Sequence, residues 1–308
     1  MRVIRGRHNI RADDRGCVVT IGNFDGVHLG HQAILAAVKA KADSSHADSM
    51  LICFEPQPKE FFDEFQAPAR LTRFREKVEK LSQFGVDRIL CMKFDEATRS
   101  MSGQVFVQFL VESLAPAAVY VGDDFRFGSD RSGGIDALHQ AGKLHGFSVE
   151  NFYTITEGAE RVSSTRIRAC LKVGDFNEAK ALLGRPYTIS GRVVYGRQIG
   201  RTLGVPTANI QLHRYTAPLS GVYAVRGKVL DQVLEGVANV GVRPTLEDGA
   251  LKPILEVHFF GLGREIYGEK VEIEFIEKIR DEQKFESLDA LKTAIFSDIE
   301  RARQVFAE

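Results

Sequence analysis

The hydrophobic pattern of the sequence changes once, at the turn Gly184-Arg185-Pro186. Before this turn, short apolar runs alternate with amphipathic stretches of helical spacing, which is typical of βαβ units and a parallel sheet. After it, short strands with alternating polar and apolar residues follow one another between glycines, which predicts a small barrel or sandwich. We therefore expect two domains, residues 1–183 and 184–308, each near the ~100–200 residues of a typical domain.

The same patterns predict the individual elements. In the first domain we expect strands at 17–21, 50–54, 88–93 and 118–121, and helices at 29–42, 74–84, 103–114, 135–144 and 165–173. In the second we expect strands at 187–194, 221–230, 232–239, 254–260 and 270–279. A final helix at 288–306 has Ser287 as its expected N-cap.

Composition excludes several classes of protein. The 41 Lys and Arg residues balance 41 Asp and Glu residues, whereas a bulk nucleic-acid binder usually carries a basic excess. No stretch approaches the ~18 apolar residues of a membrane span, and we expect neither a membrane partner nor a secretory signal. The four cysteines, Cys17, Cys53, Cys91 and Cys170, form no C-x-x-C pair. They indicate a reducing, cytoplasmic compartment.

The first chemical motif is Gly22-Asn-Phe-Asp-Gly-Val-His-Leu-Gly-His31, placed where an expected strand gives way to a helix. A helix N-terminus behind glycines suits phosphate, since free N–H groups and the positive dipole end meet there. His28 and His31 are three residues apart and can stabilise charge on a transferring phosphate from one side. Two alternatives stay open: a glycine turn with surface histidines, or a metal pair completed by Asp25.

The spelling His28-Leu-Gly-His31 after a strand resembles the nucleotidylyltransferase superfamily. The resemblance implies transfer of a nucleotide from a triphosphate with release of pyrophosphate. It also implies a second phosphate segment, which Arg161-Val-Ser-Ser-Thr-Arg-Ile-Arg168 matches. An N-capped helix with solvated arginines is the alternative for that segment. The implied ATP contacts are Gly22, Phe24, Asp25, His28, His31, Arg161, Ser163, Ser164, Thr165 and Arg168.

Two further segments resemble bacterial FMN adenylyltransferases: residues 121–134, rich in glycine, and Phe54-Glu-Pro-Gln-Pro-Lys-Glu-Phe-Phe62. Aromatic rings there can border a flat ring, the prolines can stiffen a loop, and a carboxylate can accept a donor or help to hold magnesium. The alternative is a loop with two core phenylalanines. The implied flavin contacts are Phe54, Pro56, Pro58, Phe62, Asp124, Phe125 and Phe127.

The second domain carries a glycine-rich stretch from Gly191 to Asn209 that can fold over phosphates, although a turn-rich hairpin would have the same composition. Its end, Pro206-Thr-Ala-Asn209, resembles riboflavin kinases. The resemblance implies that Thr207 and Asn209 contact Mg-ATP and hold the metal. The other implied ATP contacts are Gly191, Gly196, Arg197, Gly200, Gly204 and Pro206.

On the expected strand 254–260, Glu256 and His258 face the same way. A carboxylate aimed at a substrate hydroxyl can accept its proton, and the resemblance gives this role of general base to Glu256. A solvent-facing glutamate is the alternative. Arg280, ahead of an expected surface loop, is a candidate contact to flavin or nucleotide.

From about Cys17 to the last helix, the chain resembles bacterial bifunctional riboflavin kinases/FMN adenylyltransferases. The resemblance implies a Rossmann-like α/β nucleotidylyltransferase domain with a parallel sheet, then a β-barrel kinase domain with a C-terminal helix. It implies riboflavin, FMN and ATP as partners, Mg²⁺ as cofactor, no nucleic acid, no membrane, and a monomer or weak homo-oligomer. Two rival functions are an adenylyltransferase for another small phosphate, and a flavin-storing or RNA-binding barrel joined to an inactive enzyme.

Overall fold

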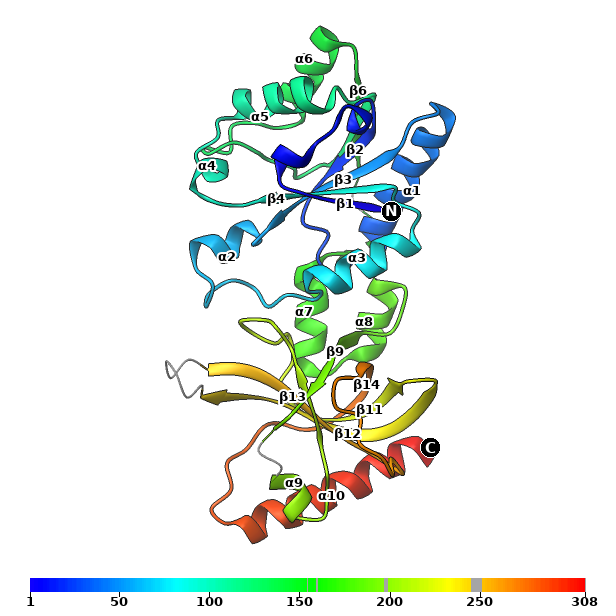
Figure 1. Ribbon diagram of the computed structural model, residues 1–308, viewed down its shortest axis with the longest axis vertical. Coiled ribbons are helices and arrows are strands. Elements are labelled where there is room, and N and C mark those ends of the chain that lie inside the picture. Colours follow the sequence, from blue (N-terminus) through cyan, green and yellow to red (C-terminus); the bar gives the residue numbers. More distant parts are fainter. Residues whose placement is uncertain (154, 159, 197–198, 245–250, 308) are drawn as a thin grey trace. The chain divides into compact units, whose positions relative to one another are not determined.

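The structure is a computed structural model that describes residues 1–153, 155–158, 160–196, 199–244 and 251–307 (Figure 1). The contacts within the chain divide it into two compact units. The first comprises Met1–Ala67 with Phe74–Ser163, and the second comprises Pro68–Arg73 with Ser164–Glu308.

The first unit is built on a six-stranded sheet in the order β1-β4-β3-β2-β5-β6, with every pair of neighbours parallel. Its strands are β1 (Arg2–Arg5), β2 (Val18–Ile21), β3 (Ser49–Glu55), β4 (Arg88–Lys93), β5 (Ala118–Gly122) and β6 (Ser148–Phe152). Its α-helices are α1 (Leu29–Ser44), α2 (Pro58–Phe62), α3 (Phe74–Gln83), α4 (Glu96–Arg99), α5 (Gly103–Phe109) and α6 (Ile135–His145). Smaller elements are the 3-10 turns Arg7–Asn9 and Ala12–Asp14, the π-helical turn Leu110–Leu114, and the hairpin β7 (Thr156–Glu157) and β8 (Glu160–Arg161).

Both faces of this sheet are covered. Alternate residues of β3 belong to two different apolar clusters: Met50 and Ile52 to one, Leu51 and Cys53 to the other. All four side chains are buried, as expected for a parallel strand with helices on both sides. The continuous apolar runs of the sequence therefore have a direct structural cause.

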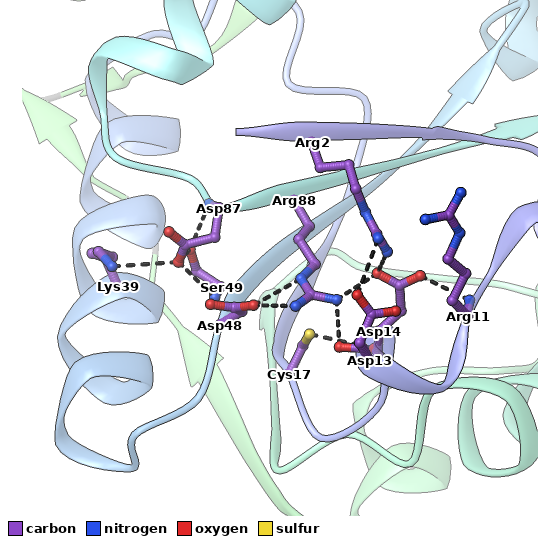
Figure 2. A network of polar contacts seen from close by, with 10 residues as sticks. All are labelled: Arg2, Arg11, Asp13, Asp14, Cys17, Lys39, Asp48, Ser49, Asp87 and Arg88. Carbon is purple, nitrogen blue, oxygen red and sulfur yellow. Dashed lines mark hydrogen bonds and ion pairs between the residues drawn. The ribbon is translucent and has the colours of Figure 1, made fainter.

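The amino ends of the strands are tied together by a polar network (Figure 2). Arg88, at the start of β4, donates to Asp14 at 2.5 Å and from Nε to Asp48 at 2.9 Å. Arg2 also pairs with Asp14, which is fully buried. Although burial raises the pKa of Asp14, hydrogen bonds from the Arg11 N–H and the Arg88 side chain, with the charges of Arg2 and Arg88, bring it below the ordinary value. This edge is structural, since ligands of parallel sheets bind at the opposite, carboxyl edge.

The second unit is a closed antiparallel barrel in the order β10-β13-β12-β11-β14-β9, flanked by helices. Its strands are β9 (Thr188–Val194), β10 (Ala208–Gln211), β11 (Gly221–Val229), β12 (Gln232–Pro244), β13 (Leu251–Phe259) and β14 (Lys270–Arg280). Its helices are α7 (Ser164–Val173), α8 (Phe176–Leu183), α9 (Ile199–Thr202) and α10 (Leu288–Ala307).

The structure confirms the α/β architecture, and the expected barrel or sandwich is a barrel. Every strand and helix predicted from the sequence is present, most within one or two residues of the expected ends, although β12 runs on to Pro244 and β13 begins at Leu251. Ser287 Oγ accepts the Ala290 N–H at 3.1 Å, as expected for the N-cap. One helix differs, because the expected helix 103–114 becomes π-helical from Leu110. The elements that the sequence did not predict are β1, β6, the hairpin of β7 and β8, β10, α8 and the shortest turns and helices.

The division by packing falls earlier than the predicted boundary at 183/184. Helices α7 and α8 belong to the barrel unit, because Phe176 stacks on Phe275 at 6.0 Å and meets Tyr223 edge-on at 5.8 Å. The functional ranges 1–183 and 184–308 stay a prediction. Within the part of the chain that the structure describes, no helix is long and apolar enough to cross a membrane.

Candidate active sites

In the first unit, the turn between β2 and α1 places its first histidine as a helix cap. His28 is the N-cap of α1, and its Nδ1 accepts the N–H of His31 at 3.3 Å. Because Nδ1 accepts a hydrogen bond, it has a lone pair and no proton. In the neutral form of His28 the ring proton is therefore on Nε2. His28 thus caps the helix with one nitrogen and offers a donor with the other.

The rings of this turn form a stack. His31 stacks on His28 at 3.6 Å and on Phe24 at 4.6 Å between ring centroids. Phe24 and Val27 have positive φ angles of 48° and 44°, which non-glycine residues adopt mainly where the surroundings impose them, often at functional sites. The turn therefore holds its histidines in one defined arrangement.

The glycines of the motif leave room for these rings. A Cβ on Gly30 would lie 3.2 Å from the His28 ring, and one on Gly22 would lie 3.1 Å from the Phe24 ring. The first turn of α1 contains no acidic residue, so its dipole end favours an anion. Asp25, in the same turn, is buried. Among the described residues, no group of three or more His, Cys, Asp or Glu side chains is arranged to hold a metal ion.

The second phosphate segment, residues 161–168, is divided between the units. In the first, the Val162 carbonyl lies 3.8 Å from the position of a Cβ on Gly30, and Arg161 donates to Asp124 at 2.9 Å. Ser163 is the last residue of that unit.

The remaining members open α7 in the second unit, where Ser164 and Thr165 form a first turn without acidic residues. Arg168, one turn further on, donates from Nε to the carbonyl of Ala69 at 2.6 Å. A helix N-terminus with hydroxyl side chains in its first turn suits phosphate.

The predicted flavin residues near β3 belong to an aromatic cluster. Phe54 and Phe61 each meet the ring of Phe94 edge-on, at 5.9 and 5.4 Å, and Phe62 lies 6.2 Å from it. Phe62 is 63% exposed, and Arg99 lies 5.6 Å above its ring. The cluster therefore presents an aromatic surface at the carboxyl ends of β3 and β4.

The prolines of that segment behave differently from each other. Pro56 follows a cis peptide bond after Glu55, the last residue of β3. Pro58 is not in a loop but is the first residue of α2, a position where its missing N–H costs nothing. The predicted stiff loop is thus a turn followed by a short helix.

The two phenylalanines of the other flavin segment differ in burial. Phe127 is buried and packs 5.2 Å from Phe106 in the core, as the alternative interpretation stated. Phe125 stacks on Phe127 at 5.6 Å and is only partly buried. Asp124 lies beside them on the surface, paired with Arg161.

In the second unit, a pocket of about 290 Å³ gathers the main kinase residues predicted from the sequence. Gly200, Thr207, Glu256 and Arg280 all line it. They come from α9, from the residue ahead of β10, and from the barrel strands β13 and β14. Apolar side chains also line it, from the barrel strands, from α10 and from the segment between α9 and β10: Leu203, Val205, Val222, Val237, Leu291 and Ile295.

Glu256 has an amide neighbour on each side. Its Cα partner on β10 is Asn209, and its Cα partner on β12 is Asn239, which also lines the pocket. Directly paired residues of adjacent strands project to the same face of a sheet. The carboxylate therefore lies between two side chains that can donate and accept hydrogen bonds.

The glycines before this pocket are explained by close approach. A Cβ on Gly196 would lie 2.4 Å from the Asn209 amide, and one on Gly200 would lie 2.3 Å from the Val205 carbonyl. Gly204 has a φ of 82°. Gly191 is in β9, where a Cβ would lie 2.5 Å from Ile210, so barrel packing accounts for this glycine. The predicted contact Arg197 lies outside the described residues.

Sequence reasoning missed Asn239, Phe285 and Asp298. Arg280 donates to both carboxylate oxygens of Asp298, and its guanidinium lies 5.5 Å from the Phe285 ring. The signal for Asp298 was present, because it follows Leu291 and Ile295 at helical spacing and is an acid on an apolar face. Asn239 is the polar last residue of the expected strand 232–239, a weaker signal.

Two family models match the chain. That of FAD synthetase covers residues 10–166, and that of riboflavin kinase covers residues 183–306. A bifunctional riboflavin kinase/FMN adenylyltransferase from Pseudomonas fluorescens is 48% identical over 308 residues, which is 100% of this chain and 98% of the relative. The chain belongs to the bifunctional riboflavin kinase/FMN adenylyltransferase family.

Other members of the bifunctional riboflavin kinase/FMN adenylyltransferase family are similar over their whole length. Those from Haemophilus influenzae (strain ATCC 51907 / DSM 11121 / KW20 / Rd) and Escherichia coli (strain K12) are 46% and 45% identical, and each match covers 99% of this chain and 98% or more of the relative. A solved Streptococcus pneumoniae structure, described as a macrolide-efflux protein, matches with a TM-score of 0.80 and 29% identity over 98% of both chains. The chain thus carries a FAD synthetase domain and a riboflavin kinase domain.

Proposed function

We propose that the barrel domain phosphorylates riboflavin to FMN with ATP, and that the sheet domain transfers AMP from a second ATP to FMN. The products of the second step are FAD and pyrophosphate. The observation that carries this proposal is the meeting of Thr207, Glu256 and Arg280 in one pocket of the barrel. An adenylyltransferase for another small phosphate would leave that pocket unexplained.

In the kinase step, Glu256 accepts the proton of the ribityl 5′-hydroxyl as its oxygen attacks the γ-phosphate of ATP. The apolar wall of the pocket suits the isoalloxazine ring, and Arg280 lies at its edge. Thr207 and Asn209 supply neutral oxygen ligands of the kind that Mg²⁺ accepts, and Gly196 keeps backbone close to Asn209. Bound Mg²⁺ supplies positive charge to the phosphates. We assign Gly200, Gly204 and Pro206 to shaping the ATP site.

In the adenylyl transfer, the FMN phosphate attacks the α-phosphate of ATP without a protein nucleophile. Catalysis is then positioning and charge stabilisation. His28 offers its Nε2 proton, His31 is held against it by stacking, and the N-terminus of α1 adds its dipole. We assign Arg161, Ser163, Ser164, Thr165 and Arg168 to the triphosphate.

We assign the flavin ring of FMN to the aromatic surface formed by Phe54 and Phe62, with Phe125 at its border and Phe127 as support from the core. Asp124 is paired with Arg161, so it can orient that arginine toward phosphate. We propose ranges 1–183 and 184–308 for the two functions, a cytoplasmic location in keeping with four free cysteines, and a monomer or weak homo-oligomer that binds neither nucleic acid nor membrane.

The test is a time course with purified protein, riboflavin, ATP and Mg²⁺, in which riboflavin, FMN and FAD are separated by chromatography. We expect FMN to rise first and FAD to follow. FMN without FAD would overturn the acceptor assigned to the sheet domain. Unchanged riboflavin, in air and under reducing conditions, would overturn the kinase assignment and favour another adenylyl acceptor. Salt-dependent retention on RNA would favour the RNA-binding barrel.

A further inference from the structure

His258 lines the kinase pocket but has no part in the chemistry described above. It lies two residues after Glu256 on β13, so both side chains project to the same face of the barrel wall. Its ring meets Phe260 edge-on at 5.9 Å. The contact that distinguishes it is polar, because Nδ1 lies 2.8 Å from the carbonyl oxygen of Pro206.

The chemistry of the two atoms decides the direction of this bond. A carbonyl oxygen only accepts, so Nδ1 of His258 donates the proton. Proline has no N–H, so the carbonyl is the sole backbone group through which Pro206 can be held. The histidine thus binds the single hydrogen-bonding group that the residue offers.

The position of Pro206 gives the bond its importance. The β10–β13 ladder begins with Ala208 opposite Val257, so Pro206 and Thr207 precede the backbone pairing. Continuing the register by one residue sets Thr207 opposite His258. The side chain of His258 therefore extends the attachment of this segment to β13 beyond the last ladder bond.

The other end of the segment is also held. The Val205 N–H donates to the Gly200 carbonyl at 2.7 Å, which closes a turn around α9. Between that turn and the start of β10, the His258 bond determines where Pro206 lies. Since Thr207 follows directly, the bond also sets the position of the Thr207 hydroxyl relative to Glu256 on the same strand as His258.

We propose that His258 is a positioning residue of the kinase site, which holds the ATP-binding segment at Pro206 in register with the general base. The proposal rests on the roles of Thr207 and Glu256 in the proposed function. It assigns to His258 an effect on ATP and its metal and none on riboflavin, because the held segment carries Thr207.

The experiment compares three variants of the full-length chain in steady-state assays of FMN formation. His258→Leu removes the donor, His258→Asn keeps an N–H near Nδ1, and His258→Gln places one near Nε2. We expect kcat/KM for ATP to fall about tenfold in His258→Leu, the equivalent of one lost hydrogen bond. In His258→Leu the Mg²⁺ concentration needed for activity should rise, and KM for riboflavin should stay unchanged. His258→Asn should recover most of the loss in kcat/KM for ATP.

Adenylylation of added FMN by the same preparations is the internal control for folding of the chain, and thermal unfolding reports on the barrel. Wild-type kinetics in His258→Leu would overturn the proposal. Recovery by His258→Gln instead of His258→Asn would also overturn it, in favour of a direct contact from Nε2 to substrate. If Glu256→Gln kept full kinase activity, the proposed function itself would fail, which is a separate outcome.

Discussion

Arg280 at the end of β14 donates two hydrogen bonds to the carboxylate of Asp298 on α10, from Nε at 2.8 Å and from Nη2 at 2.7 Å. The pairing is bidentate, the geometry in which arginine and carboxylate bind most strongly. Both residues line the kinase pocket, so Asp298 on the C-terminal helix sets the orientation of the Arg280 guanidinium in that pocket.

Asp298→Asn should therefore weaken both the barrel and its substrate site. Asp298 is buried, and a hydrogen bond to a charged group contributes about 1.5–3 kcal/mol, so we expect a loss of about 2 kcal/mol in the free energy of unfolding. KM for riboflavin should rise while adenylylation of added FMN persists. Urea unfolding and steady-state kinetics measure the two effects. Asp289→Asn, exposed on the same helix, is the control, and equal behaviour of the two variants would contradict the prediction.

Glu256→Gln should nearly abolish the phosphorylation of riboflavin and spare the adenylylation of FMN. Loss of a general base typically costs about 10²–10⁴ in rate. FMN formation from riboflavin should fall within that range, whereas FAD formation from added FMN should keep the wild-type rate. Glu235→Gln, an exposed position on β12, should leave both rates unchanged. Loss of both activities in a folded Glu256→Gln protein would contradict the assignment of two separate sites.

His31→Ala should reduce the adenylylation of FMN and spare the phosphorylation of riboflavin. Removing the ring that stacks between Phe24 and His28 deprives the phosphate site of one donor and loosens the other. We expect FAD formation to fall about 10²–10³-fold, the usual effect of losing a group that stabilises developing charge. Riboflavin phosphorylation should continue. His139→Ala, exposed on α6, serves as the control, and a matching decline there would refute a specific role for His31.

Gly196→Ala tests the close approach of backbone to Asn209. The new Cβ would lie 2.4 Å from the amide, so either the side chain or the loop must move. Displacement of a substrate-positioning group by about 1 Å can reduce the rate about 10²-fold, and we expect a loss of that order in kcat/KM for ATP. Gly263→Ala adds a methyl group with nothing within 4 Å and should have no effect. Unchanged ATP kinetics in Gly196→Ala would remove Asn209 from the metal site.

The network around Asp14 predicts how the stability of the sheet domain depends on pH. The pKa of Asp14 is lowered by folding, so its contribution is complete above the ordinary carboxyl pKa of about 3.9. That contribution is lost as the pH falls through the lower pKa of the folded state. Asp14→Asn should lower the unfolding midpoint in urea at pH 7 and weaken its dependence on pH below about 4. Asp13→Asn removes an exposed partner of Arg2 and should change neither.

Local patterns predicted the geometry of the turn from Gly22 to His31 better than that of the pocket in the barrel. The segment from Gly22 to His31 is contiguous, so its cap, its stack and its glycine contacts all form within one turn of chain. The kinase pocket instead combines residues from Gly200 to Asp298. Asn239 and Asp298 reach the pocket through strand pairing and helix packing, and neither can be predicted from the local hydrophobic pattern of the sequence.

The sequence by itself determined a parallel α/β domain followed by a β-rich domain, and the order of the motifs, because hydrophobic period and glycine spacing are local properties of the chain; that the β-rich domain is a closed barrel came from the tertiary structure. Tertiary structure decided which of the marked residues meet. The strand register alone sets Glu256 between Asn209 and Asn239. Barrel closure requires β10, which is too short to be recognised from its hydrophobic pattern. Tertiary packing also moved Phe127 into the core and joined Asp298 to Arg280. These contacts join residues distant in sequence, so their energies come from burial and pairing that exist only in the folded chain.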